Sequence, residues 1–379
     1  MEPATTLRIA EPRELLAYVP YRLGFVPARS AVLVSLRGPR HEVGLVVRVD
    51  LADLLDPADG ARVARTLVSH LDRDGARRAV LVLYLPQGPG VPSGAPAHRA
   101  VAHVRQAADV PLGPVDVLVV GDEGYGCLAC DHGCCPPGGR PLRDLQSTAV
   151  GARMVLEGVA VAASRADVAR IALAPAEARR SVARVRARWA AAARDAHAAG
   201  GEGLAAWRAG VLAAWRVEVA RAGDPTAVPA RPTGLACLGR IEAGLADRRV
   251  RDAVLVTFVP GTGRLAERSL AGAGPEPADD AAIGQAVAAV VDPARAVPPP
   301  STTGLHEAVL ERVVAHGARG AQAPALTLLG LLAWWRGDGA RAGVLVGMAL
   351  EDEPGHRLAL LLEGTLDAGL APGWVRRDA

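Results

Sequence analysis

The first 145 residues alternate between short apolar runs and amphipathic segments. Two stretches have the apolar spacing of helices. One lies between the second and third apolar runs, and the other lies between the third and fourth. The runs are Ala31–Leu36, Val43–Val49, Arg78–Leu85 and Val115–Val120, and the helical stretches are Pro57–Asp72 and Ala97–Ala108. Because the runs are apolar almost throughout, we expect helices to cover both faces of the sheet. The pattern predicts an α/β N-terminal domain with a mixed sheet over residues 1–145.

The segment before the first run carries two prolines. Pro20 and Pro27 each fix φ and lack a backbone donor. The sequence therefore predicts a rigid bend between them, after a short helix over Glu11–Tyr18.

From residue 146 the apolar spacing is helical almost throughout, which predicts an all-α domain over residues 146–323. The stretch Arg249–Val259 is ambiguous, because its Val, Thr and Phe favour a strand while its neighbours favour a helix. We expect a helix there.

Residues 324–379 hold the best internal pattern of the chain. Gly330 and Gly364 lie 34 residues apart, each after a Leu-rich turn. Between them Ala342, Ala349 and Pro354 fall where a tetratricopeptide repeat places small residues and a proline. The segment is similar to one such repeat followed by the first helix of the next. An ordinary helical hairpin is the alternative interpretation.

Composition excludes several classes of chemistry. The 379 residues include 43 basic and 40 acidic side chains, so the net charge of +3 gives no case for nucleic acid or an anionic membrane as partner. All the basic residues counted are Arg, and neither Lys nor Asn occurs. This excludes phosphate-loop and kinase lysines, lysine Schiff bases and Cys-His-Asn triads. The bias indicates a GC-rich genome, such as that of an actinobacterium.

No secretory signal or membrane-length apolar run is apparent, so the sequence predicts a cytoplasmic protein. Its cysteines are then expected as thiols, metal ligands or redox groups before structural disulfides. Four of them crowd into the loop 127–139: Cys127, Cys130, Cys134 and Cys135, with His132 among them.

This cysteine cluster permits three interpretations. Cys127 and Cys130 have the spacing of one zinc knuckle, which would make zinc a cofactor, but a second separated pair is missing. Cys130 paired with Cys134 or Cys135 would make a redox switch. Alternatively, the thiols only pack in a compact turn. No other cofactor is expected.

Acidic residues at strand ends are the candidate catalytic groups. Asp122 and Glu123 follow one predicted strand, while Arg48 and Asp50 end another, two residues apart and so on one face. Ligands gather at the carboxyl ends of strands in α/β sheets. An ion pair and solvated turn residues explain the same pattern. The glycines at 121, 124 and 126 lack the dinucleotide spacing and are typical of a turn.

Five stretches, in this order, carry a resemblance to a known family: Leu15–Ser30, Arg48–Leu51, Cys134–Pro141, Val250–Asp252 and Gly330–Ala340. Together they resemble the actinobacterial domain of unknown function family 4192, over nearly the whole chain. The resemblance implies no reaction. It also favours a helix at Arg249–Val259.

These observations predict a non-catalytic binding or regulatory protein that contacts a protein partner through its helical half. One alternative is an α/β-domain enzyme, a hydrolase or nucleotide-handling protein, that uses Asp50, Asp122 and Glu123. The other is a zinc or thiol redox switch at the cysteine cluster. The sequence does not specify the partner, the ligand or the oligomeric state.

Overall fold

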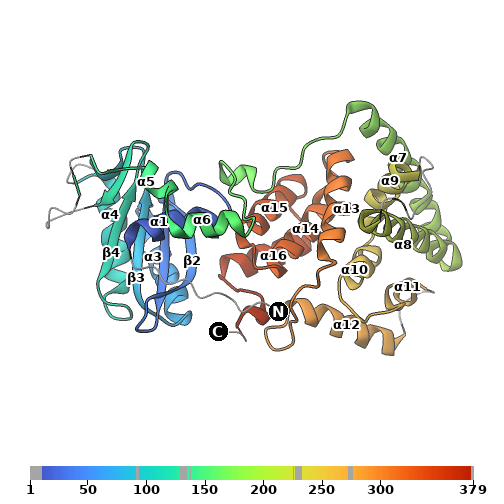
Figure 1. Cartoon of the computed structure of the whole chain (residues 1–379). Coiled ribbons are helices and arrows are strands. Elements are labelled where there is room, and N and C mark those ends of the chain that lie inside the picture. The colour runs from blue at the N-terminus through green and yellow to red at the C-terminus, as the bar shows by residue number, and fades with distance from the viewer. Residues whose placement is uncertain are drawn as a thin grey trace. The chain divides into compact units, whose positions relative to one another are not determined.

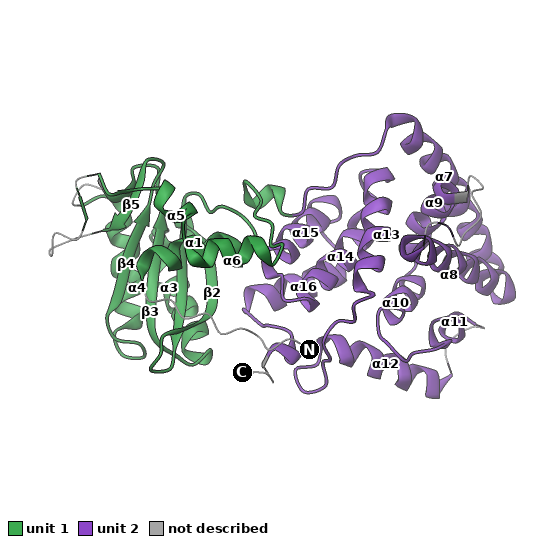
Figure 2. Ribbon diagram, in the orientation of Figure 1, with its two compact units in different colours: residues 1–168 green, residues 169–379 purple. Residues whose placement is uncertain are grey.

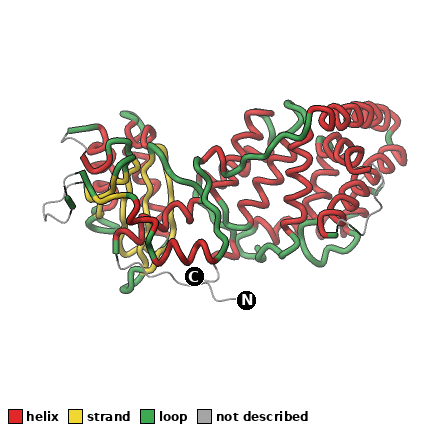
Figure 3. Tube along the Cα trace, turned by 45° about the horizontal axis from the view of Figure 1, so that its top comes forward, coloured by secondary structure: helices red, strands yellow, loops and turns green. Residues whose placement is uncertain are grey.

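The structure, a computed structural model, describes residues 11–90, 94–128, 135–136, 138–224, 226, 233–271 and 276–376. The chain forms two compact units, residues 1–168 and 169–379 (Figure 2). All strands of the described residues lie in the first unit, and the second is helical (Figure 3). The division falls after Val168, beyond the boundary expected at residue 145.

A six-stranded mixed sheet forms the centre of the first unit, in the order β2-β1-β3-β4-β5-β6. Only β3 and β4 pair in parallel. The strands are β1 (Ser30–Arg37), β2 (Glu42–Asp50), β3 (Ala76–Tyr84), β4 (Val115–Val120), β5 (Gly124–Cys127) and β6 (Arg140–Pro141). The mixed sheet is as predicted, but β5 and β6 were not foreseen, because such short strands contain no apolar run.

Alternate strand residues face two layers of helices. One face, with Leu33, Leu81 and Val119, packs in a core with residues of α2 (Leu51–Leu55), α3 (Gly60–Arg73) and α4 (Pro96–Ala108). The other face buries Val32 and Val82. In Figure 1 the helices α1 (Pro12–Leu23), α5 (Arg143–Gln146) and α6 (Ala149–Leu156) lie in front of the sheet.

The predicted bend at Pro20 is wrong, because Pro20 lies inside α1. The helix ends only at Gly24, whose φ of 77° closes it in the left-handed conformation. Apolar residues of α1 from Leu15 to Leu23 are buried, and this packing outweighs the hydrogen bond that the proline removes. The Glu14 carboxylate also accepts hydrogen bonds from the first N–H groups of α6.

The second unit packs ten helices around one core in its described residues. They are α7 (Ala176–Ala199), α8 (Gly201–Gly223), α9 (Thr233–Leu245), α10 (Arg248–Val256), α11 (Leu265–Leu270), α12 (Pro277–Val291), α13 (Thr303–His316), α14 (Ala323–Trp335), α15 (Gly339–Asp352) and α16 (Arg357–Asp367). The helix expected near Arg249–Val259 is confirmed as α10. The tetratricopeptide-like character of α14–α16 stays a prediction.

Candidate functional site

The polar residues at the end of β2 form one compact contact. Arg48 donates from Nε to the Ser30 hydroxyl at 2.9 Å and from Nη2 to Asp50 at 2.5 Å. Arg165 approaches the second carboxylate oxygen of Asp50 at 3.8 Å. Arg48 and Asp50 therefore share a face, as their spacing predicts, and Asp50 is already engaged by two guanidinium groups.

The other predicted acids lie elsewhere along the sheet. Asp122 and Glu123 are exposed in the turn between β4 and β5. Asp50 ends β2, whereas Asp122 and Glu123 follow β4. The strands β1 and β3 lie between β2 and β4, so β2 and β4 are three strand spacings of about 4.8 Å apart, or about 14 Å. The structure thus does not bring the three carboxylates together.

Gly121 begins the turn that the glycine spacing predicts, whereas Gly124 and Gly126 belong to the strand β5 that follows it. The Gly121 N–H donates to the Gly124 carbonyl at 2.8 Å, and a side chain at Gly121 would overlap the backbone of Gly88. The glycines permit close backbone approach, and among the described residues the strands β5 and β6 come next rather than a helix that could hold a phosphate.

Only part of the cysteine cluster lies in the described residues. Cys127 ends β5, and its N–H donates to the Cys135 sulfur at 3.3 Å. Cys130, His132 and Cys134 lie outside the described residues. No group of three or more metal-ligating side chains occurs among the residues that are described. Cys127 belongs to β5, whereas Asp50 ends β2, and the strands β1, β3 and β4 lie between β2 and β5.

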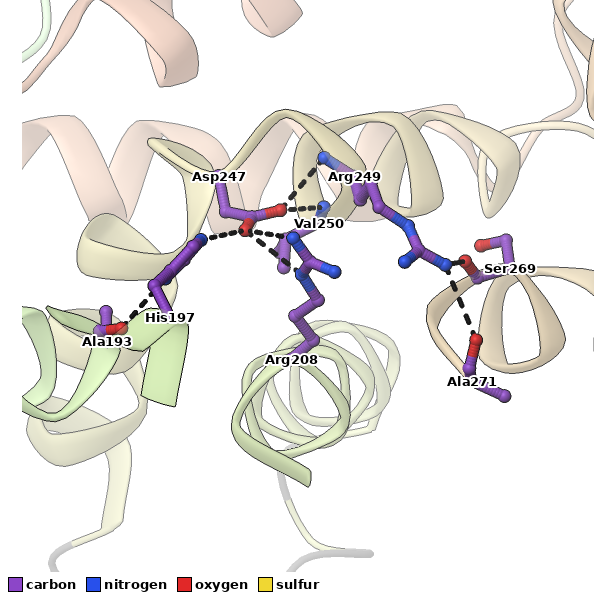
Figure 4. Close-up of polar contacts among 8 residues, drawn as sticks. All are labelled: Ala193, His197, Arg208, Asp247, Arg249, Val250, Ser269 and Ala271. Carbon is purple, nitrogen blue, oxygen red and sulfur yellow. Dashed lines mark hydrogen bonds and ion pairs between the residues drawn. The ribbon is translucent and has the colours of Figure 1, made fainter. Parts of the chain in front are cut away.

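The helical unit holds a buried polar cluster around Asp247 (Figure 4). One carboxylate oxygen of Asp247 caps α10 by accepting from the N–H groups of Arg249 and Val250, at 2.9 and 3.1 Å. The other oxygen accepts from Nε and Nη2 of Arg208 on α8, at 3.0 and 2.8 Å. Both side chains are nearly inaccessible, with 6% and 10% exposed. The Asp247 carboxylate therefore ties α8 to α10.

His197 joins α7 to the same carboxylate without forming a catalytic dyad. Its Nε2 lies 3.4 Å from Asp247, and its Nδ1 lies 2.8 Å from the Ala193 carbonyl (Figure 4). Both neighbours are oxygen acceptors, so both ring nitrogens lie against groups of the protein itself. A dyad needs one ring nitrogen directed at substrate, and here both nitrogens are engaged within the protein.

Arg249 extends the cluster to α11. Its guanidinium donates to the carbonyl of Ser269 and, at 3.5 Å, to that of Ala271 (Figure 4). Burial lowers the pKa of Arg249, the nearby Arg208 adds to this, and Asp247 opposes it. Asp247 thus bonds to the start of α10, and Arg249 bonds to the end of α11. Together with Arg208 of α8 and His197 of α7, the cluster connects four helices.

The exposed side of α7 carries a row of unpaired arginines. Arg180, Arg184 and Arg188 are spaced by four residues, so they lie on one face of the helix, and all three are exposed. None of them makes an ion pair or hydrogen bond with the described part of the chain. The opposite side of α7 packs on the core through Val182 and Trp189. We call these three residues the arginine row.

The α7 helix lies close against its neighbours. A side chain at Gly239 of α9 would meet the Val182 carbonyl at 2.7 Å, so only glycine permits this crossing of α7 and α9. The indole Nε1 of Trp207 on α8 donates to the Trp189 carbonyl at 3.1 Å, and the two indoles stack. The arginine row is therefore carried by a helix that is held along its length.

Sequence reasoning missed this row although its signal was readable. The segment from Pro175 is Arg- and Ala-rich, and the four-residue period of three arginines indicates one face. The period alone does not show that the arginines have no acidic partners in the described part of the chain. That information requires the positions of the neighbouring helices. The remaining cysteine, Cys237, offers no reactive thiol, because burial and then the charge of Glu218 raise its pKa.

Comparison with known proteins places the chain in a family. No curated protein and no solved structure matches it. Among the described residues, no helix has the length and apolarity needed to cross a bilayer. The model of one family, described as the domain of unknown function DUF4192, matches residues 12–373, nearly the full length. The chain is a member of the DUF4192 family.

Proposed function

We propose that the protein is a non-catalytic binding or regulatory protein whose helical unit binds an acidic segment of a partner protein through the arginine row. The observation that carries this proposal is the unpaired state of Arg180, Arg184 and Arg188 within the described residues. Like charges at this spacing destabilise a helix by about 0.2–0.5 kcal/mol per pair. Carboxylates of a partner would turn this cost into attraction.

The surroundings of the row favour a helical protein partner over nucleic acid. Ala187 is exposed beside the arginine row, and its small side chain leaves room for a second helix. Single-stranded nucleic acid is usually held by aromatic side chains that stack on its bases. The aromatic residue of α7, Trp189, faces the core instead. An acidic helix with carboxylates every fourth residue fits this face best.

Binding of designed peptides to the full chain tests the proposal. The first probe is an alanine-based helical peptide of about 20 residues with glutamate at every fourth position. A second peptide has the same composition, with its glutamates distributed over all faces. We expect the first to bind more tightly, and the triple variant Arg180→Ala, Arg184→Ala, Arg188→Ala to weaken binding about tenfold, roughly 1.4 kcal/mol.

Two controls make the result specific. Arg65→Ala removes an exposed arginine of α3 that has no ion-pair partner in the described part of the chain, and it should leave binding unchanged. Raising the salt concentration should weaken binding by the wild type more than by the triple variant. Equal binding of the two peptides would contradict the proposal. Tighter binding of duplex DNA through the same arginines would replace the acidic helix by nucleic acid.

A further inference from the structure

The outer edge of β2 is a second candidate binding surface, because backbone groups along it have no partner among the described residues. β2 is nine residues long and ends the sheet, and it pairs only with β1 within the described residues. Natural proteins usually protect such an edge with prolines, charges, bulges or a covering segment, because its backbone invites a further strand.

The strand register shows which backbone groups point outward. The Leu51 N–H donates to the Arg29 carbonyl at 3.0 Å, and this pair continues the register in which Asp50 opposes Ser30. In an antiparallel pair, residues that bond to the neighbour alternate with residues that point away. Val49 and Val47 therefore bond to β1, whereas the N–H groups of Val46, Arg48 and Asp50 point away from it. No hydrogen bond from these three N–H groups to the described chain is present.

A bulge limits the usable part of the edge. The β1–β2 register shifts between Val34 and Leu36, where Gly44 and Leu45 both oppose Ser35. Asp74 occupies this bulge: its carboxylate accepts from the Leu45 N–H at 2.8 Å and from Arg37. A side chain at Gly44 would overlap Asp74. The regular edge is thus the five-residue stretch Val46–Asp50.

Beside this edge the core of the first unit is incomplete. Several apolar side chains there pack on the core but remain partly exposed, and this apolar rim consists of Leu45, Val47, Val49, Leu51, Leu55, Val63 and Leu67. They come from β2, α2 and α3. A strand added along β2 would project every second side chain toward this rim and complete its burial.

We propose that the β2 edge binds an extended segment of a partner protein, with apolar residues at alternate positions, as a seventh strand. Backbone hydrogen bonds to Val46, Arg48 and Asp50 would give affinity, and the apolar rim would select the side chains. A second copy of this chain fits less well. Five residues pair over about 17 Å, and such a ladder buries far less than the roughly 1,000 Å² of a stable interface.

The test uses a peptide of alternating valine and threonine, about ten residues long, with the full chain. Two derivatives carry backbone N-methyl groups, one at the odd and one at the even positions. Because only alternate N–H groups of an added strand face β2, one derivative should bind like the parent and the other about tenfold more weakly. Equal effects of the two methylation patterns, or no binding by the parent peptide, would overturn the proposal.

Two further measurements locate the peptide. Its binding should slow amide hydrogen exchange at Val46 and Arg48 in the wild type, without change in α7. Val46→Pro removes an outward N–H and no bond to β1, so the variant should fold and lose the peptide. Protection at α7 in place of β2 would contradict the proposal. Dimerisation of the chain that Val46→Pro abolishes would assign the edge to a second copy and overturn it.

Discussion

His306 on α13 is a buried histidine enclosed by aromatic rings. Its ring stacks on Trp215 at 5.7 Å and lies 5.0 Å from Phe258, and its Nδ1 has no hydrogen-bond partner in the described chain. Burial, helped by the charge of Arg216, lowers the pKa of His306 from 6.5 to about 4. The neutral ring is therefore the form that the folded helical unit accepts.

This shift predicts acid sensitivity of the helical unit. The unfolded chain binds a proton at His306 below pH 6.5, while the folded chain does so only near pH 4. The free energy of unfolding should thus fall by about 3 kcal/mol from this site as the pH drops from 6.5 to 4. His306→Phe keeps the aromatic packing and should reduce that fall. Urea unfolding at several pH values measures it, and an unchanged slope in the variant would contradict the prediction.

Glu242 on α9 is a second buried titratable residue, and its pKa is shifted upward, whereas that of His306 is shifted downward. It is buried, and its Oε1 accepts from the Ala318 N–H at 2.8 Å and from Gln322 at 3.1 Å. Its Oε2 lies 3.7 Å from Arg186, beyond hydrogen-bond distance. Burial raises the pKa of Glu242, although the Ala318 bond and Arg186 lower it in part.

Replacement of Glu242 by glutamine should therefore stabilise the fold near neutral pH. Because the folded pKa lies above the unfolded one, ionisation of Glu242 removes stability as the pH rises through the folded value. Glu242→Gln keeps the acceptor oxygen and removes this dependence, whereas Glu242→Ala leaves Ala318 and Gln322 without their acceptor. Thermal unfolding at pH 5 and pH 8 compares the three proteins. A glutamine variant less stable than wild type at pH 8 would show that Arg186 compensates the charge.

At the scale of elements, the Asp247 cluster should dominate the stability of the helical unit. Asp247→Asn keeps an oxygen for the cap of α10 but leaves the buried Arg208 without a counter-charge. We expect a loss of about 2–4 kcal/mol in the free energy of unfolding. Asp252→Asn, on the same helix, breaks more exposed pairs with Arg248 and Arg251 and should cost less than about 1 kcal/mol. Urea unfolding measures both, and equal losses would contradict the role assigned to the cluster.

The elements also show where sequence reasoning succeeds and fails. The four long strands follow from their apolar runs, which are local signals, and α10 was expected from its helical neighbours and from the family resemblance. The Pro20 bend failed because burial of α1 outweighs a local rule. The separation of Asp50 from Asp122 was not predictable, since it depends on the strand order, which places β1 and β3 between β2 and β4. The arginine row could be recognised from its four-residue period alone. Its lack of acidic partners among the described residues could be recognised only from the tertiary structure.

For the whole molecule, the positions of the tryptophans allow the folding of the two units to be followed separately. All six tryptophans of the sequence lie in residues 169–379, so tryptophan fluorescence reports on the helical unit alone. Each unit also has its own core among the described residues. We therefore expect residues 1–168 and residues 169–379 to fold as separate fragments, each with one cooperative transition in urea.

Deletion of residues 324–379 tests whether the last helices are a separable module. Every residue of α14 is buried, and its side chains belong to the same core as those of α8 and α10. Removing this segment should therefore unfold the helical unit and shift the emission of the remaining Trp189, Trp207 and Trp215 to that of solvated indole. Amide protection of β3 should persist, with fragment 1–168 as the reference. A truncated chain with a sharp tryptophan transition would instead mark α14–α16 as an independent repeat-like module, because only a self-contained segment can leave the remaining core intact.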